Sequence, residues 1–136
     1  MADARGVKNP PTERGDVITA TTTYTLKNSD SGKICKWNST TAFNFNLPPV
    51  QKAFKGVFYD FIIMTAASSG TGHGVSPNAV DTVYNPAGAA TDDKDVYFAT
   101  ASDKVGLGFR LVSDGVNGWH LIHLYDDDTA SLTQQA

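Results

Sequence analysis

The sequence predicts an all-β protein, folded as a single-domain β-sandwich or a partly closed barrel. Among 136 residues there are 15 Thr but only one Glu and seven Leu. Thr, Asn, Asp and Gly favour strands and turns, whereas helical proteins are rich in Glu and Leu. Apolar residues also recur at every second position in several short segments, which is the period of a strand. This composition argues against a helical bundle, a coiled coil and a disordered chain.

Charge and hydropathy limit the classes of partner. Eleven basic and 14 acidic residues give a net charge of −3, and no three basic residues are consecutive, which argues against nucleic-acid binding. The longest apolar stretch, 57–67, is interrupted by Asp60 and is too short to cross a bilayer. Residues 1–16 lack the apolar region of a signal peptide, and the single Cys35 can form no intrachain disulfide. We therefore expect a protein made in a reducing cytoplasm that binds neither membranes nor nucleic acids.

The chain divides into three parts. Residues 1–16 hold two prolines and charges of both signs but almost no large apolar side chain. Such a segment buries too little surface to offset the entropy of ordering it, so we expect a flexible arm that orders only on a partner. Residues 17–125 carry the strand patterns and form the β domain. Residues 126–136 are a polar tail that we expect to be frayed.

The first half of the β domain shows strand patterns separated by turns. Residues 17–26 combine Thr with Val, Ile and Tyr and predict one or two strands, and the polar residues 27–32 predict a turn. Residues 33–37 resume an extended pattern. In residues 43–47 Phe and Leu alternate with Asn, which predicts a strand with one apolar face. The two prolines that follow end this strand, because proline donates no ladder hydrogen bond.

The central segments are harder to assign. Residues 50–55 predict one short helical turn. Residues 56–65 are apolar on both faces apart from Asp60, which predicts a central strand covered on both sides. Residues 66–95 are rich in Gly, Ser, Asn and Pro, so we expect a long loop that is either functional or faces a partner, with a short strand near 80–84.

A hairpin near the C-terminus is the strongest local signal. After a short strand at 96–100, apolar residues alternate through 107–112, the sequence SDGVNG turns the chain, and 119–124 form the last strand. Two apolar runs joined by a short segment of Asp, Gly and Asn are typical of a β-hairpin. About seven or eight short strands at this spacing favour a sandwich or barrel.

Two groups of residues carry metal-binding side chains, and for each a solvated surface is the simpler interpretation. His120 and His123 are followed by three aspartates at 126–128, but positions three apart on a strand point to opposite faces. The aspartates within 92–95 offer oxygen ligands, but a lysine interrupts them and the EF-hand spacing is missing. We predict no metal site and no cofactor.

Candidate catalytic residues have similarly plain interpretations. The sequence GTGHG at 70–74 lacks the Lys-Ser/Thr of a P-loop and predicts a flexible turn. His73 within it has no nucleophile motif nearby, although a triad assembled from distant residues stays open. Lys33 and Lys36 flank Cys35 in a setting that lowers a thiol pKa, but a small, partly buried strand residue is favoured. We predict no catalytic residue and no enzyme.

Three features resemble small β domains of tailed-phage virion proteins. A Thr/Tyr strand followed by the turn NSDSGK, within 21–37, resembles the opening of these domains, and FNLP at 45–48 resembles a strand that ends in Leu-Pro. Residues 70–77 and the hairpin of 111–124, with its LVSDG sequence and Gly-Trp step, resemble the later part. The likeness spans residues 17–125.

The resemblance implies a jelly-roll or β-tulip type of sandwich and a structural role in a virion. In that family the domain occurs as capsid decoration (cement) proteins and also on tail fibres. The chain then corresponds to a homotrimeric decoration protein, made in the host cytoplasm, that binds the major capsid protein on the outside of a phage head and stabilises the shell. We expect partner contacts from the arm and from the 66–95 loop, through Arg5, Lys8, Pro10, Pro11, Arg14 and His73.

Two other functions stay open at this point. A tail-fibre or receptor- and carbohydrate-binding module would use Trp37, Trp119 or Tyr125 as a stacking platform on one exposed face. Aromatic residues on strands belong more often to the core, however. A small hydrolase or metal enzyme built around His120 is the third interpretation.

Overall fold

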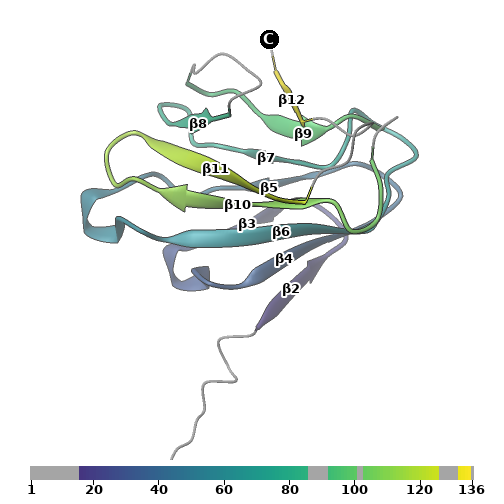
Figure 1. Ribbon diagram of the computed structural model, residues 1–136, viewed down its shortest axis with the longest axis horizontal. Helices are drawn as coiled ribbons and strands as arrows, with labels where there is room; N and C mark the ends of the chain where they lie inside the picture. Colours follow the sequence, from purple (N-terminus) through teal and green to yellow (C-terminus); the bar gives the residue numbers. More distant parts are fainter. Residues whose placement is uncertain (1–15, 86–91, 101–102, 126–131, 136) are drawn as a thin grey trace, which may run out of the picture.

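The computed structural model describes residues 16–85, 92–100, 103–125 and 132–135, and these form two β-sheets packed face to face (Figure 1). Neither sheet closes on itself, so the fold is a β-sandwich and the barrel alternative falls away. The first sheet has the spatial order β2 (Val17–Ala20), β4 (Ile34–Asn38), β6 (Phe58–Thr65), β10 (Gly108–Ser113), β11 (Gly118–Tyr125), β8 (Thr82–Tyr84). The second has the order β12 (Leu132–Gln134), β9 (Val96–Phe98), β7 (Gly74–Ser76), β5 (Asn44–Asn46), β3 (Tyr24–Thr25).

From β2 to β10 the chain alternates between the two sheets. Within this stretch the even-numbered strands lie in the first sheet and the odd-numbered strands in the second, whereas β11 follows β10 in the first sheet and β12 belongs to the second. Strands that are neighbours in a sheet are therefore often two places apart in sequence, and β2–β4, β4–β6, β3–β5 and β5–β7 all pair in parallel. Because parallel strands point the same way, the carboxyl ends of β3, β5 and β7 meet at one end of the second sheet.

Two single-turn 3₁₀ helices connect the sheets. They are η2 (Asn28–Asp30) after β3 and η3 (Lys52–Phe54) after β5. Each is followed two residues later by a glycine in the left-handed region, Gly32 and Gly56, a conformation that costs other residues energy. The expected turn at 27–32 and the expected helical turn at 50–55 are thus confirmed. In the described residues no helix is long and apolar enough to cross a membrane.

Trp37 of β4 lies at the centre of the core. Its buried ring lies 5.6–6.0 Å, centroid to centroid, from Phe45, Phe61 and Phe109. The indole N–H donates a hydrogen bond to the carbonyl of Gly74 at 3.1 Å. Phe45 and Gly74 belong to the second sheet, whereas Phe61 and Phe109 belong to the first. One side chain therefore joins both layers by packing and by a buried hydrogen bond.

β6 is a central strand, as expected, but only one of its faces is covered. Tyr59, Phe61 and Ile63 are fully buried, whereas the residues between them point outward and Met64 is 46% exposed. The prediction that both faces are covered is wrong for the described chain, because a sandwich has only two layers. An apolar sequence pattern predicts that side chains are shielded from water, but it does not predict which element or partner shields them.

Two segments expected to be irregular contain strands. The 66–95 loop contributes β7 to the middle of the second sheet, in addition to the expected strand near 80–84, which is β8. The sequence gives little sign of β7, because it is short and opens with Gly74, where a Cβ would collide with the carbonyl of Val96. In the tail, β12 pairs with β9 and buries Leu132, so residues 132–134 are not frayed.

We expect Trp37→Phe to lower the free energy of unfolding by about 3 kcal/mol, because it leaves a cavity and removes the buried hydrogen bond from the indole to the Gly74 carbonyl. Urea denaturation measures this change. Val80→Ala is the control, because Val80 is 73% exposed and its truncation is expected to change stability by less than about 0.5 kcal/mol. A loss for Trp37→Phe no larger than that of the control would contradict the central role of the indole.

Candidate interaction surface

The outer face of the first sheet carries a group of apolar side chains, and Lys36, Asp60 and Arg110 are charged residues on the same face. Along β4, β6 and β10 the residues between the buried ones point away from the second sheet. Three apolar residues of this outer face are about half exposed, namely Val17 of β2 (45%), Met64 of β6 (46%) and Ile122 of β11 (50%). We call this surface the apolar face. Its residues, from β2 across to β11, are Val17, Ile34, Phe58, Ile62, Met64, Val112 and Ile122.

Strand pairing makes the apolar face continuous. Val17 is paired with Ile34, Ile34 with Asp60, Asp60 with Arg110, and Arg110 with Ile122. This row crosses five strands of the first sheet. Directly opposed residues on neighbouring strands have Cβ atoms about 5 Å apart, so their side chains touch. The apolar residues therefore form one surface, which also contains the Asp60–Arg110 pair and Lys36, the residue paired with Ile62.

The central charges of the apolar face neutralise each other. Arg110 donates to both carboxylate oxygens of Asp60, with Nε–Oδ1 and Nη2–Oδ2 distances of 2.7 and 3.1 Å. Its guanidinium also lies 4.7 Å from the ring centroid of Phe58. The hydrogen bonds and the charge of Asp60 raise the pKa of Arg110, which therefore stays protonated. An apolar partner can cover such a pair without leaving either charge unpaired.

The outer face of the second sheet is polar instead. Its outward-pointing residues carry hydroxyl and amide groups, and some of these bond to one another. Asn46 donates to Thr25 at 3.4 Å, and Asn44 donates to Asp95 at 2.9 Å. The two outer faces of the sandwich therefore differ in kind. The residues of the polar face are Thr25, Asn44, Asn46, Ser76, Tyr97 and Thr133.

His73, expected from the sequence to contact a partner, is fully buried at the entrance to β7. Its Nδ1 accepts a hydrogen bond from the N–H of Phe43 at 3.3 Å. Its Nε2 lies 2.9 Å from the carbonyl of Ser39 and 3.0 Å from that of Thr65, so it donates. Both ring nitrogens are thus held by backbone groups. This placement suits a structural residue and not a surface contact or a general base.

The carboxylate nearest to His73 is not positioned for catalysis either. Asp103 accepts a hydrogen bond from the backbone N–H of His73 at 3.3 Å, not from its imidazole. Burial raises the pKa of Asp103, although the nearby histidine and backbone hydrogen bonds act in the opposite direction. The described residues therefore show no acid–base relay through His73.

Cys35 and both tryptophans belong to the core. Cys35 is fully buried, and burial raises the pKa of its thiol to about 12, so its flanking lysines do not activate it. Trp37 and Trp119 have no exposed surface. A sugar-stacking platform made by these tryptophans is therefore ruled out. The side chain of Tyr125 lies outside the described residues.

His120 forms a polar cluster at the end of the β10–β11 hairpin. Its Nε2 lies 3.1 Å from a carboxylate oxygen of Asp114, and its ring stacks on Tyr84 with centroids 4.7 Å apart. The Tyr84 hydroxyl donates to the side chain of Asn117 at 3.0 Å. The described residues hold no group of three side chains able to share a metal ion. The cluster is therefore a bonded surface feature, and the side chain of His123 is outside the described part.

Asp114 holds the hairpin turn through its other carboxylate oxygen. Burial acts to raise the pKa of Asp114, but the hydrogen bonds that it accepts outweigh this effect and lower the pKa below the usual value. The ionised form is therefore favoured in the folded protein. The donors to this oxygen are the backbone N–H groups of Val116, Asn117 and Gly118, at 2.8, 3.0 and 3.1 Å.

The other residues expected to contact a partner are in the arm. Arg5, Lys8, Pro10, Pro11 and Arg14 lie outside the described residues. What the structure adds is the apolar face, which the sequence analysis did not single out. Its one signal in the sequence is the two-sided apolar pattern of 56–65, which led to the prediction of a covered strand.

Comparison with known proteins gives no assignment, because no protein-family model and no curated protein matches this chain.

We expect Asp114→Asn to lower the free energy of unfolding by about 1 kcal/mol at pH 7, because the charged acceptor is lost from the turn. The pKa of Asp114 is lower in the folded than in the unfolded state, so its contribution is present above about pH 4 and lost as the pH falls through the folded-state value. Urea unfolding at pH 7 and at about pH 3 measures this.

Asp92→Asn is the matched control, since Asp92 is exposed and its carboxylate accepts no hydrogen bond from the described residues. If the deficit of Asp114→Asn were the same at both pH values, the charged turn would not be its cause.

Proposed function

We propose that this protein is a structural virion protein, a capsid decoration protein that attaches to the outside of a phage head and stabilises the shell. The observation that carries the proposal is the apolar face, which nothing in the described chain covers. An apolar surface spread over five strands is typical of a protein–protein contact. The sequence resemblance to small virion β domains then supports the choice of a capsid as the partner.

The occupant of the apolar face in this proposal is the major capsid protein. A decoration protein has no transition state to stabilise and works by burying surface across shell subunits. The internal pairing of Asp60 with Arg110 leaves the centre of the face neutral, so a flat apolar surface of the shell fits it. Burial of the half-exposed Val17, Met64 and Ile122 would supply much of the gain.

The arm adds to the same contact. Residues 1–16 lead into β2, which is the edge strand of the first sheet and carries Val17 of the apolar face (Figure 1). An arm that begins beside this face reaches the partner that the face covers, and it orders on binding. Three copies in a homotrimer would present three faces and three arms. Simultaneous contacts with several shell subunits would then raise the overall strength of attachment.

We expect deletion of residues 1–16 to leave the melting temperature nearly unchanged and to weaken capsid attachment by about tenfold or more, because the arm contributes contact area only when bound. Thermal unfolding measures the first effect. Co-sedimentation with heads assembled from the major capsid protein of the same genome measures the second. Unchanged co-sedimentation would remove the arm from the contact.

We expect Ile122→Asp to abolish attachment while leaving the fold intact, because it places a charge where the partner surface is apolar and Ile122 is already half exposed. The same co-sedimentation assay, with circular dichroism as the folding check, tests this. Val116→Asp is the matched control, since Val116 is 80% exposed in the hairpin turn and lies off the apolar face. Equal binding of the two folded variants would exclude the apolar face as the attachment site.

A further inference from the structure

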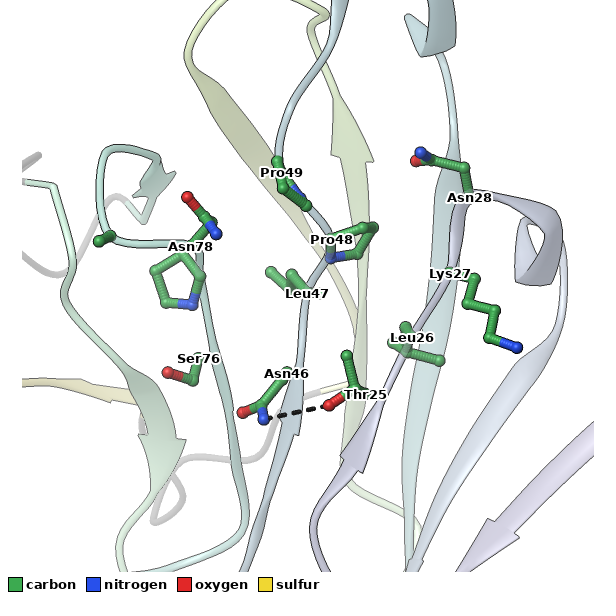
Figure 2. Close-up of a pocket in the computed structure, with 12 residues that line it drawn as sticks. Thr25, Leu26, Lys27, Asn28, Asn46, Leu47, Pro48, Pro49, Ser76 and Asn78 are labelled. Atoms are coloured by element: carbon green, nitrogen blue, oxygen red, sulfur yellow. Dashed lines mark hydrogen bonds between the residues drawn. The ribbon is translucent and has the colours of Figure 1, made fainter.

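A pocket of about 570 Å³ lies where β3, β5 and β7 end. Figure 2 shows three chain segments side by side there, with Leu47, Pro48 and Pro49 in the middle one. The strand register explains this arrangement, because Thr25 is paired with Asn46 and Asn46 with Ser76. Beyond this row the proline-containing segments no longer continue the ladder, and the three segments line an open site.

The pocket presents polar side chains without partners in the described structure. Among the residues that the structure describes, the side chains of Asn28, Ser76 and Asn78 have no hydrogen-bond partner. The backbone N–H of Asp81 donates to the carbonyl of Asn78 and so fixes the backbone at this position. Amides and hydroxyls both donate and accept, which is what recognition of several neighbouring hydroxyl groups requires. No carboxylate lines the pocket.

The charge and the apolar surface of the pocket further limit the class of ligand that it can bind. Lys27 is the one charged residue among the lining residues, and its side chain is exposed and has no ion pair in the described chain. The lining therefore carries a charge of +1 in a protein whose net charge is −3. Pro49 is exposed and supplies apolar surface between the polar groups, whereas Pro48 beside it is buried (Figure 2).

We propose that this pocket binds an acidic saccharide, with the sugar hydroxyls bonded by Asn28, Ser76 and Asn78 and the carboxylate paired with Lys27. The C–H face of a sugar ring packs on the exposed Pro49. A volume of about 570 Å³ falls within the range of small-molecule sites. The site replaces the aromatic platform that burial of Trp37 and Trp119 rules out.

The location of the pocket is compatible with the attachment proposed above but does not depend on it. Thr25, Asn46 and Ser76 belong to the polar face of the second sheet, on the side of the sandwich opposite the apolar face. A copy docked through the apolar face would leave the pocket directed away from the shell. Sugar binding by the isolated protein can therefore be tested without capsids.

The test is a titration of the ¹⁵N-labelled full chain followed by NMR, with glucuronic acid and N-acetylneuraminic acid as probes and glucose as the neutral probe. We expect the acidic sugars to shift the amide signals of the lining residues, with a dissociation constant of about 1 mM, and glucose to bind about tenfold more weakly. Sodium acetate and inorganic phosphate are titrated in parallel, because each supplies an anion without a sugar ring.

Variants separate the two parts of the site. Lys27→Gln is expected to abolish the preference for acidic over neutral sugars, and Asn78→Ala to weaken both by about tenfold. Lys52→Gln, at an exposed lysine in η3 outside the pocket, is the matched control and is expected to bind like the parent.

Three results would overturn the proposal. The first is that the amide signals of the lining residues do not shift at sugar concentrations of about 20 mM. The second is that acetate or phosphate shifts these signals as much as the acidic sugars do. The third is that Lys27→Gln and Lys52→Gln have the same effect on sugar binding. The first removes the site, the second reduces it to anion binding, and the third places the binding elsewhere. None of them bears on capsid attachment, which the apolar-face variants test separately.

Discussion

The fold depends on the packing of one indole ring between two sheets. Trp37 contacts aromatic rings of both layers and donates its N–H to the carbonyl of Gly74. The hydrogen bond is satisfied only at one separation and one register of the sheets, so it specifies the packing as well as stabilising it. His73 stacks on the same indole and binds three backbone groups around it. The histidine that the sequence analysis placed at a partner contact belongs instead to this core.

The side chains that could act as catalytic or stacking groups are buried in the core, so we expect function on the surfaces of the two sheets. Cys35, His73, Trp37 and Trp119 are all buried and held by packing or hydrogen bonds. The outer faces of the two sheets differ. The first sheet presents apolar side chains around the Asp60–Arg110 pair, and the second presents amide and hydroxyl groups. A two-faced sandwich of this kind can bind different partners on opposite sides, one by excluding water and the other by directional hydrogen bonds.

The alternation of the chain between the sheets links the core to both surfaces. It makes β3, β5 and β7 parallel, and it brings their carboxyl ends together in the pocket that contains Asn46 and Pro48. It also places β2, which carries Val17 of the apolar face, at the edge of the first sheet. Hairpins alone would put successive strand ends at alternating ends of a sheet and would build neither arrangement.

The sequence alone determined the all-β class, most strand positions and the β10–β11 hairpin, because period-two alternation and turn residues are local signals. It could not determine β7 and β12, whose pairing depends on distant partners such as β9. Nor could it separate buried from exposed apolar residues: Phe61 and Ile62 look alike in sequence, and only the second sheet decides that Phe61 is covered and Ile62 lies on the open side. Both candidate sites arise in this way, since each joins side chains from strands that only the tertiary structure brings together.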